Sequence, residues 1–238
     1  MSNERVNCHV FVDFDGTIVP ADVTDTLFGR HALPEWLDIE ADWKAGRIGS
    51  RECMARQVDL LRATPEAYDA VAASVDVDPD FPAFVELCRS RGIGLTVVSD
   101  GLDRSILNVL GRAGLDLPFY ANRLEHLGGD RWRLGFPHAR TACTTMSGNC
   151  KCQFTEAYPA MTRIMIGDGR SDFCISGRVD FTFAKGALTT HCRDNRLPHL
   201  AVAGFADVVD VFGRWLERTP AGSRLEGVVV ESIGNEQA

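Results

Sequence analysis

The stretch HVFVDFDGTIVPAD, residues 9–22, contains the pattern that decides the fold. Its first four residues are strand-forming, and the run ends in two acidic side chains, Asp13 and Asp15, followed at once by a Gly-Thr pair. Residues i and i+2 of an extended segment point the same way, so we expect the two carboxylates to face one pocket, about 6 to 7 Å apart. Carboxylates this close repel each other, and a cation must offset the repulsion.

Composition places the chain among ordinary globular proteins. Of its 238 residues 45% are hydrophobic and 24% are charged, and no apolar run reaches the length of about eighteen residues that a membrane span requires. The net charge of −8 argues against a nucleic-acid partner, and the polar start MSNERVNC does not have the pattern of a signal peptide. We therefore expect a cytoplasmic protein with no membrane partner; the sequence does not indicate an oligomeric state.

Eight cysteines are scattered through the chain, at positions 8, 53, 88, 143, 150, 152, 174 and 192. Without an export signal, reduced thiols are the expected state. Cys143, Cys150 and Cys152 crowd behind His138, which raises a zinc site as an alternative to packing or redox roles. Because the chain has no Cys-x-x-Cys pair, we favour packed or half-exposed thiols.

The order of the remaining elements predicts an α/β fold with an insertion. Apolar residues at helical spacing between about 22 and 75 predict a small helical cap, whereas strand and helix patterns alternate afterwards. Residues 119–136 predict a β-hairpin that turns at Gly128-Gly129-Asp130. We expect a doubly wound, Rossmann-like parallel sheet with the cap inserted after the first strand. The expected division is a catalytic core at 1–20 and 78–218, a cap at 21–77 and a C-terminal tail at 219–238.

Three predicted strands end in polar, glycine-flanked groups: Asp13 to Thr17, Ser99-Asp100-Gly101, and Gly167-Asp168-Gly169 with Asp172 beyond. In an open α/β sheet the ligand lies outside the carboxyl ends of the strands, so these groups should converge. Magnesium suits such carboxylates, because it takes oxygen ligands together with waters and a substrate phosphate.

Lys151, just upstream of the third acidic strand, adds a compact positive charge suited to a phosphoryl group. These groups together predict a phosphoryl-transfer site. The expected course is attack by Asp13 to give an aspartyl-phosphate, while Asp15 protonates the leaving alcohol and then activates water.

The four motifs DFDGT, VVSDG, a downstream lysine and GDGRSD resemble those of the haloacid dehalogenase-like phosphatases, over roughly residues 9 to 215. The resemblance implies Asp13 as nucleophile and Asp15 as general acid and base. It implies magnesium ligation by the Asp13 carboxylate, the Asp15 carbonyl and Asp168, with Asp172 supporting the metal waters. The phosphate-binding residues expected from these motifs are Thr17, Ser99, Asp100, Gly101 and Lys151. The insertion is similar to the cap of the phosphoserine-phosphatase-like branch.

The substrate is a small phosphorylated metabolite whose identity the sequence leaves open. The segment FPHARTACTTMSGNCKC resembles the methionine-salvage phosphatases that act on 2-hydroxy-3-keto-5-methylthiopentenyl-1-phosphate. The Asn149-x-Lys151 spacing and the GDGxxDFC pattern are shared with phosphocholine and phosphoethanolamine phosphatases. Phosphoserine phosphatase is a weaker alternative, because Gln57 stands where that group has an arginine and Asp22 is a shorter acidic residue.

The cap is expected to supply specificity. Asp22, Arg51 and Arg56 are the candidates, with Arg47 beside them, although each also fits a solvated helix face. Phe28, Trp36 and Trp43 fit a cap core better than a choline cage.

Other classes remain as alternatives. A non-catalytic receiver-like module would also accept a phosphoryl group, but such modules are about half this length and have no cap. Phosphonatases carry a cap lysine, for which Lys44 is the candidate, and dehalogenases do not have the Asp15-type acid that this chain has.

Overall fold

The computed structural model describes residues 6–225 and divides the chain into two compact units. Among the described residues, the first unit contains 6–18, 78–97 and 151–225, and the second contains 19–77 and 98–150.

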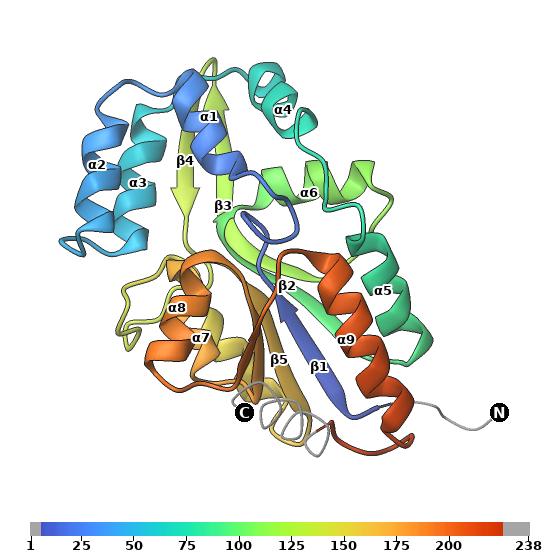
Figure 1. Ribbon diagram of the computed structural model, residues 1–238. Coiled ribbons are helices and arrows are strands. Elements are labelled where there is room, and N and C mark those ends of the chain that lie inside the picture. Colours follow the sequence, from blue (N-terminus) through green and yellow to red (C-terminus); the bar gives the residue numbers. More distant parts are fainter. Residues whose placement is uncertain (1–5, 226–238) are drawn as a thin grey trace. The chain divides into compact units, whose positions relative to one another are not determined.

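The first unit is built on parallel strands (Figure 1). The central strand β1 pairs with β2 on one side and with β5 on the other, and β6 and β7 continue the sheet. Every residue of β1 is buried, as expected for a strand covered on both faces. The strands are β1 (Cys8–Val12), β2 (Gly94–Leu102), β5 (Thr162–Gly167), β6 (Phe181–Ala184) and β7 (His199–Ala201).

Helices cover both faces of this parallel sheet (Figure 1). On one face α5 (Phe81–Ser90) packs against α9 (Phe205–Arg218), with the ring centroid of Phe205 4.8 Å from that of Phe81 and 5.5 Å from that of Phe84. The other face carries α7 (Phe173–Ser176) and α8 (Gly186–Asp194). The short 3₁₀ segments are η1 (Lys151–Ala157) and η2 (Arg170–Asp172).

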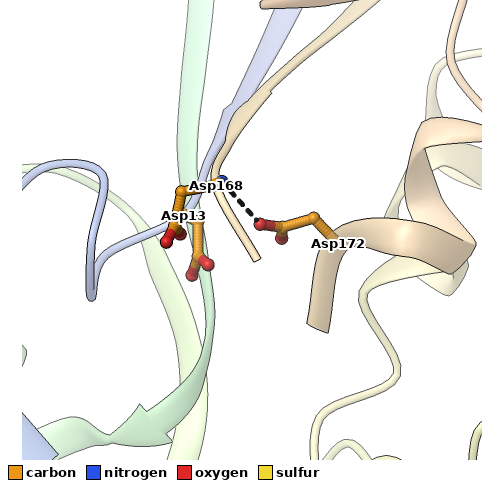
Figure 2. A group of neighbouring side chains, drawn as sticks. All are labelled: Asp13, Asp168 and Asp172. Atoms are coloured by element: carbon orange, nitrogen blue, oxygen red, sulfur yellow. Dashed lines mark hydrogen bonds between the residues drawn. The ribbon is translucent and has the colours of Figure 1, made fainter. Parts of the chain in front are cut away.

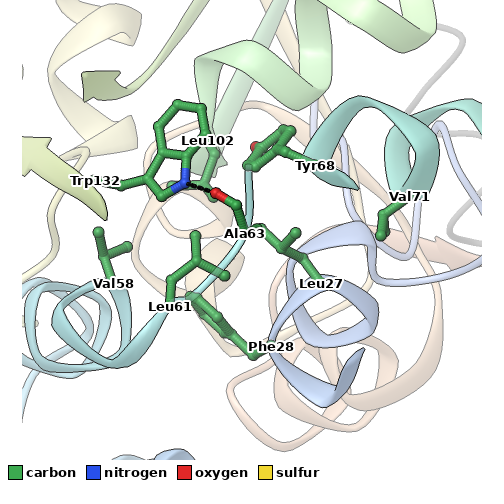
Figure 3. Packing of buried hydrophobic residues seen from close by; sticks show 9 residues of the cluster. All are labelled: Leu27, Phe28, Val58, Leu61, Ala63, Tyr68, Val71, Leu102 and Trp132. Atoms are coloured by element: carbon green, nitrogen blue, oxygen red, sulfur yellow. Dashed lines mark hydrogen bonds between the residues drawn. The ribbon is translucent and has the colours of Figure 1, made fainter. Parts of the chain in front are cut away.

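The second unit combines helices with a hairpin. Its helices are α1 (Val23–His31), α2 (Trp36–Lys44), α3 (Ser50–Leu60), α4 (Pro65–Ala73) and α6 (Asp103–Arg112). The strands β3 (Phe119–Gly128) and β4 (Arg131–Gly135) pair antiparallel, which confirms the predicted hairpin. One buried cluster joins the hairpin to the helices: Leu27, Phe28, Val58, Leu61, Ala63, Tyr68, Val71, Leu102 and Trp132 (Figure 3). Trp36 packs partly buried against the cluster, so Phe28 and Trp36 belong to the core as predicted, whereas the half-buried Trp43 is not part of this cluster.

The predicted fold class is confirmed. Within residues 6–225 hydrogen bonding orders the strands β4-β3-β2-β1-β5-β6-β7, a mostly parallel sheet, and helices α1 to α4 follow the first strand. Strand β2 runs through both units, since it contributes Gly94–Val97 to the first and Val98–Leu102 to the second. The division into core, cap and tail stays a prediction, and the part of the predicted tail from residue 226 onward lies outside the described residues. In the described part of the chain, no helix has the length and apolarity needed to cross a membrane.

Candidate active site

Asp13 directly follows β1 and is held by the neighbouring strand. Its backbone N–H donates to the carbonyl of Ile166 in β5, 2.9 Å away, so the pairing of the two strands continues one residue past β1. The side chain is 4% exposed, and its Oδ1 accepts a 2.7 Å hydrogen bond from the N–H of Phe14. The end of a buried strand therefore fixes this carboxylate in one orientation.

The residues after Asp13 turn instead of remaining extended. The N–H of Thr17 donates to the carbonyl of Phe14, and Gly16 adopts φ 74°. The extended strand therefore ends at Asp13, and a turn from Phe14 to Thr17 carries Asp15; that the carboxylates of Asp13 and Asp15 face one pocket stays a prediction. A glycine is required here, since a Cβ at position 16 would lie 2.3 Å from Oδ2 of Asp168.

Asp168 and Asp172 reach the same place from the end of β5 and from η2 (Figure 2). The Thr17 hydroxyl donates to Oδ1 of Asp168 over 3.2 Å, and Oδ2 of Asp172 accepts the backbone N–H of Asp168 over 3.1 Å. Ligand atoms of Asp13, Asp168 and Asp172 all lie within 4.8 Å of one another. The structure thus brings together three of the four predicted metal-binding residues, and Asp15 lies in the adjoining turn.

Lys151 is the buried cation of this cluster. Its Nζ lies 2.8 Å from Oδ1 of Asp13 and 2.7 Å from Oδ1 of Asp172, and it donates to the Ser171 hydroxyl over 3.0 Å. Burial alone would lower the pKa of Lys151, but the two carboxylates outweigh it and raise the pKa above its usual value. Lys151 therefore remains charged.

One lysine does not balance three carboxylates, and the pKa values show the imbalance. Burial, reinforced by the charge of Asp13, raises the pKa of Asp168 to about 6. Burial and the charge of Asp13 also raise the pKa of Asp172 well above its usual range. A set of clustered carboxylate oxygens with surplus negative charge fits a hard divalent cation such as Mg²⁺.

The remaining phosphate candidates lie in the second unit, in a network around Asp100. The Asp100 carboxylate accepts hydrogen bonds from the Ser50 hydroxyl, from the side chain of Asn122 and from the backbone N–H of Asn149, the last over 2.7 Å. The Ser99 side chain is buried and accepts from the N–H of Gly101, 3.0 Å away. Residues 99–101 thus form a tightly bonded segment within β2.

The specificity candidates are all in polar contacts of the second unit. Asp22 caps α1 by accepting from the N–H of Asp25 over 2.8 Å. The guanidinium of Arg56 lies 3.4 Å from Glu52, and the backbone of Arg51 donates to the carbonyl of Met146 over 3.2 Å. Gln57 is buried and donates to Glu40 over 3.0 Å. The role of Asp22, Arg51 and Arg56 in specificity stays a prediction.

The cysteines are all free thiols, as expected. Cys150 is buried, whereas Cys143 and Cys152 are half-buried. Among residues 6–225 the aspartate cluster is the group of three or more potential ligands that could hold a metal, and no cysteine takes part in it.

Asn149 belongs to the Asn149-x-Lys151 spacing noted in the sequence, although its contacts were not predicted. Its side chain donates to the carbonyls of Ser99 and Tyr120, both over 2.8 Å. Lys185, directly after β6, was not singled out in the sequence, and it donates from Nζ to the carbonyl of Gly16 over 3.0 Å. The partners are backbone carbonyls, which leave no signature in the sequence.

A parallel sheet with an aspartate cluster and a buried lysine at its strand ends defines a phosphoryl-transfer enzyme of the α/β class. The family model of the haloacid dehalogenase-like hydrolases matches residues 10–176 of the sequence, and the chain belongs to that family. It is a phosphoric monoester hydrolase, and the predicted family and enzyme class are both confirmed.

Several relatives of the chain share one name with each other. The chain is 31% identical over 212 residues to the 2-hydroxy-3-keto-5-methylthiopentenyl-1-phosphate phosphatase of Geobacillus kaustophilus (strain HTA426), covering 86% of this chain and 95% of the relative. It is 30% identical over 208 residues to the phosphatase of that name from Brevibacillus brevis (strain 47 / JCM 6285 / NBRC 100599), covering 85% and 93%.

Among solved structures, a phospho-aspartyl intermediate analogue of phosphoserine phosphatase superposes with a TM-score of 0.66. The match covers 87% of this chain and 98% of that one at 18% sequence identity. At this identity the match shows the shared fold alone.

Proposed function

We propose that this protein is a Mg²⁺-dependent phosphatase of 2-hydroxy-3-keto-5-methylthiopentenyl-1-phosphate that works through an aspartyl-phosphate. The similarity to phosphatases of that name, at 30% and 31% identity over nearly the whole of both chains, is the observation that carries the substrate. The aspartate cluster with its buried lysine supports the chemistry. We also propose a cytoplasmic location, which the polar start of the chain supports.

Asp13 is the nucleophile in this proposal, and its two oxygens have different surroundings. Oδ1 accepts hydrogen bonds from Phe14 and from Lys151. Oδ2 accepts a longer hydrogen bond of 3.4 Å from the Ser171 hydroxyl. We assign the attack on phosphorus to Oδ2, because its lone pairs are less engaged.

The reaction then proceeds in two displacements. The Asp13 carboxylate forms a bond to phosphorus as the bond to the ester oxygen breaks, and Asp15 gives its proton to the departing alcohol. Asp15 next takes a proton from a water that attacks phosphorus, which releases phosphate and restores Asp13. Lys151 remains charged throughout and neutralises the phosphoryl oxygens. Ser99 and Thr17 would donate hydrogen bonds to the phosphate.

The metal would be held by Asp13, Asp168 and the Asp15 carbonyl, with Asp172 supporting its waters. When bound, Mg²⁺ would lower the repulsion between the nucleophile and the negatively charged phosphate.

Phosphoserine is disfavoured by one contact. Gln57, at the position where the resemblance places an arginine, is 2% exposed and donates to Glu40 inside the second unit. Neighbouring Arg56 is bound to Glu52 on the helix surface. No arginine is therefore supplied by this position to bind a serine carboxylate.

The test is magnesium-dependent phosphate release from a panel of phosphomonoesters. The panel contains 2-hydroxy-3-keto-5-methylthiopentenyl-1-phosphate, phosphocholine, phosphoethanolamine and phosphoserine. We expect a kcat/KM of about 10⁴ M⁻¹s⁻¹ or more for the first, well above the others. Asp13→Asn should lose turnover, because the amide is not a nucleophile, while Asp210→Asn on the exposed face of α9 should behave as wild type.

Two results would contradict the proposal. More than about a tenth of the wild-type rate in Asp13→Asn would exclude Asp13 as the nucleophile. A preferred substrate other than the first would retain the chemistry and remove the substrate assignment.

A further inference from the structure

Lys185 connects two segments of the candidate site within the first unit. Its Nζ donates to the carbonyl of Gly16, 3.0 Å away, in the turn that follows the nucleophile Asp13. Its backbone N–H donates to the carbonyl of Gly167 over 2.9 Å, directly before Asp168. One residue at the start of α8 thus holds both the turn after β1 and the end of β5.

The turn after β1 packs closely against Asp168. The Asp168 carboxylate occupies the space where a Cβ of residue 16 would stand, and it also accepts the Thr17 hydroxyl. At φ 74° Gly16 lies in a backbone region that it can leave easily, because glycine has no side chain to restrict it. A hydrogen bond from an ammonium to its carbonyl is a direct restraint on that freedom.

We propose that Lys185 is a positioning residue for the divalent cation: by fixing the Gly16 carbonyl it holds the turn that carries Asp15 and that packs Gly16 and Thr17 against Asp168. The proposal rests on the metal dependence in the proposed function. It assigns Lys185 no contact with substrate or metal. The energetic role is preorganisation, since the ligands then need no ordering when the cation binds.

An alternative explanation of the same contact predicts that removing Lys185 changes the Mg²⁺ affinity in the opposite direction. If Lys185 acted only through its charge, it would repel a cation approaching the nearby carboxylates, and its removal would tighten Mg²⁺ binding. If it acts by holding the turn, its removal weakens binding although one positive charge is lost. The direction of the change in affinity therefore distinguishes the two.

The experiment is calorimetric titration of Mg²⁺ into the full chain, without substrate. We expect Lys185→Met to weaken Mg²⁺ binding roughly tenfold, as is typical for residues that support metal ligands. Lys185→Arg keeps a charged donor and should remain within about threefold of wild type. Arg193→Met is the matched control, because Arg193 is an exposed cation on the same helix, α8, and should bind Mg²⁺ like wild type.

Unchanged or tighter Mg²⁺ binding by folded Lys185→Met would overturn the inference. If that variant does not fold, judged by circular dichroism, Lys185→Gln decides by the same criterion. Asp168→Asn, which removes a proposed metal ligand, distinguishes failure of this inference from failure of the proposed function. Wild type that binds Mg²⁺ no better than Asp168→Asn would overturn the metal assignment and the inference together, whereas wild-type binding with no effect at Lys185 would overturn the inference alone.

Discussion

His9 is a buried histidine inside the parallel sheet, four residues before the proposed nucleophile Asp13. Its ring is 5% exposed, stacks on Tyr158 at a centroid distance of 3.7 Å, and shares a 2.9 Å hydrogen bond with the Thr96 hydroxyl. Burial lowers the pKa of His9 from 6.5 to about 4. The neutral ring is therefore the form that the folded protein accommodates.

This pKa predicts a specific acid sensitivity. Between about pH 4 and pH 6.5 the unfolded chain binds a proton at His9 that the folded protein does not, so stability falls as the pH falls. His9 should contribute about 2 kcal/mol to the loss between pH 7.5 and pH 5, whereas the raised pKa of Asp168 acts in the opposite direction in wild type and variant alike. Urea unfolding at both pH values should show a smaller loss in His9→Gln than in wild type. Equal losses in the two proteins would mean that His9 is protonated in the folded state.

The absence of a side chain at Gly16 allows the turn to pack against the Asp168 carboxylate. Gly16→Ala would introduce both an unfavourable φ and a Cβ 2.3 Å from Oδ2 of Asp168. We expect a loss of about 1–3 kcal/mol in the free energy of unfolding and a loss of activity of at least tenfold. Chemical denaturation and phosphate release measure the two effects.

The control is Gly213→Ala, in the interior of α9, where the added Cβ has no atom within 4 Å beyond the adjacent residues and the backbone of its own helix. This change should stabilise the protein by about 0.5–1 kcal/mol with normal activity. Wild-type activity in Gly16→Ala would show that the turn and Asp168 can separate without cost.

Among the elements, the β3–β4 hairpin contributes to the core of the second unit. Trp132 in β4 is 3% exposed, and its Nε1–H donates to the carbonyl of Ala63 over 2.8 Å (Figure 3). Trp132→Phe keeps an aromatic ring but leaves that carbonyl unsatisfied, so it should cost about 1–3 kcal/mol. Trp132→Ala should cost about 3–5 kcal/mol.

Urea denaturation followed by circular dichroism checks both values. Leu127→Ala, also on the hairpin but 52% exposed, should change the free energy of unfolding by less than about 0.5 kcal/mol. If Trp132→Ala were as mild as Leu127→Ala, the hairpin would be an appendage and not part of this core.

At the scale of elements, apolar runs predict where strands lie better than they predict where strands end. The apolar runs before Asp13 and Asp168 are continuous and strand-length, so both strands and the hairpin were predicted close to their observed positions. The strand expected to terminate at residues 99–101 continues to Leu102. Periodicity could not show this, because a polar Ser-Asp-Gly run looks like a loop when hydrogen bonds from Asn122 and Asn149 are unknown.

The contacts that the sequence could not predict share one physical feature. Lys151 was predicted because a family pattern accompanies it, whereas Lys185 and Asn149 act on backbone carbonyls from distant parts of the chain. A backbone carbonyl is present at every residue, so no sequence pattern marks it as a partner. Only the fold, which brings residue 185 to residue 16, reveals such a pair.

At the scale of the whole molecule, the first unit is assembled from three separate stretches of chain. The segment after α9 helps to join them. The backbone N–H of Asn7 donates to the carbonyl of Ser223 over 2.9 Å, and the N–H of Leu225 donates to the hydroxyl of Thr162 over 3.0 Å. These contacts lie where β1 and β5 begin, whereas Asp13 and Asp168 follow the other ends of the same strands. The contacts of this segment and the proposed site thus lie at opposite ends of each strand.

This separation gives a test in one variant. Leu225 is fully buried, so Leu225→Ala should lower the free energy of unfolding by about 2–5 kcal/mol. The kcat/KM of the folded enzyme at 25 °C should stay within about twofold of wild type, because the strand ends that carry the carboxylates are unaffected. Ala221→Ser, at an exposed position of the same segment, should leave both quantities unchanged. A large fall in kcat/KM for folded Leu225→Ala would mean that strain at the start of the strands reaches the aspartates, so that this segment tunes the site as well as stabilising the fold.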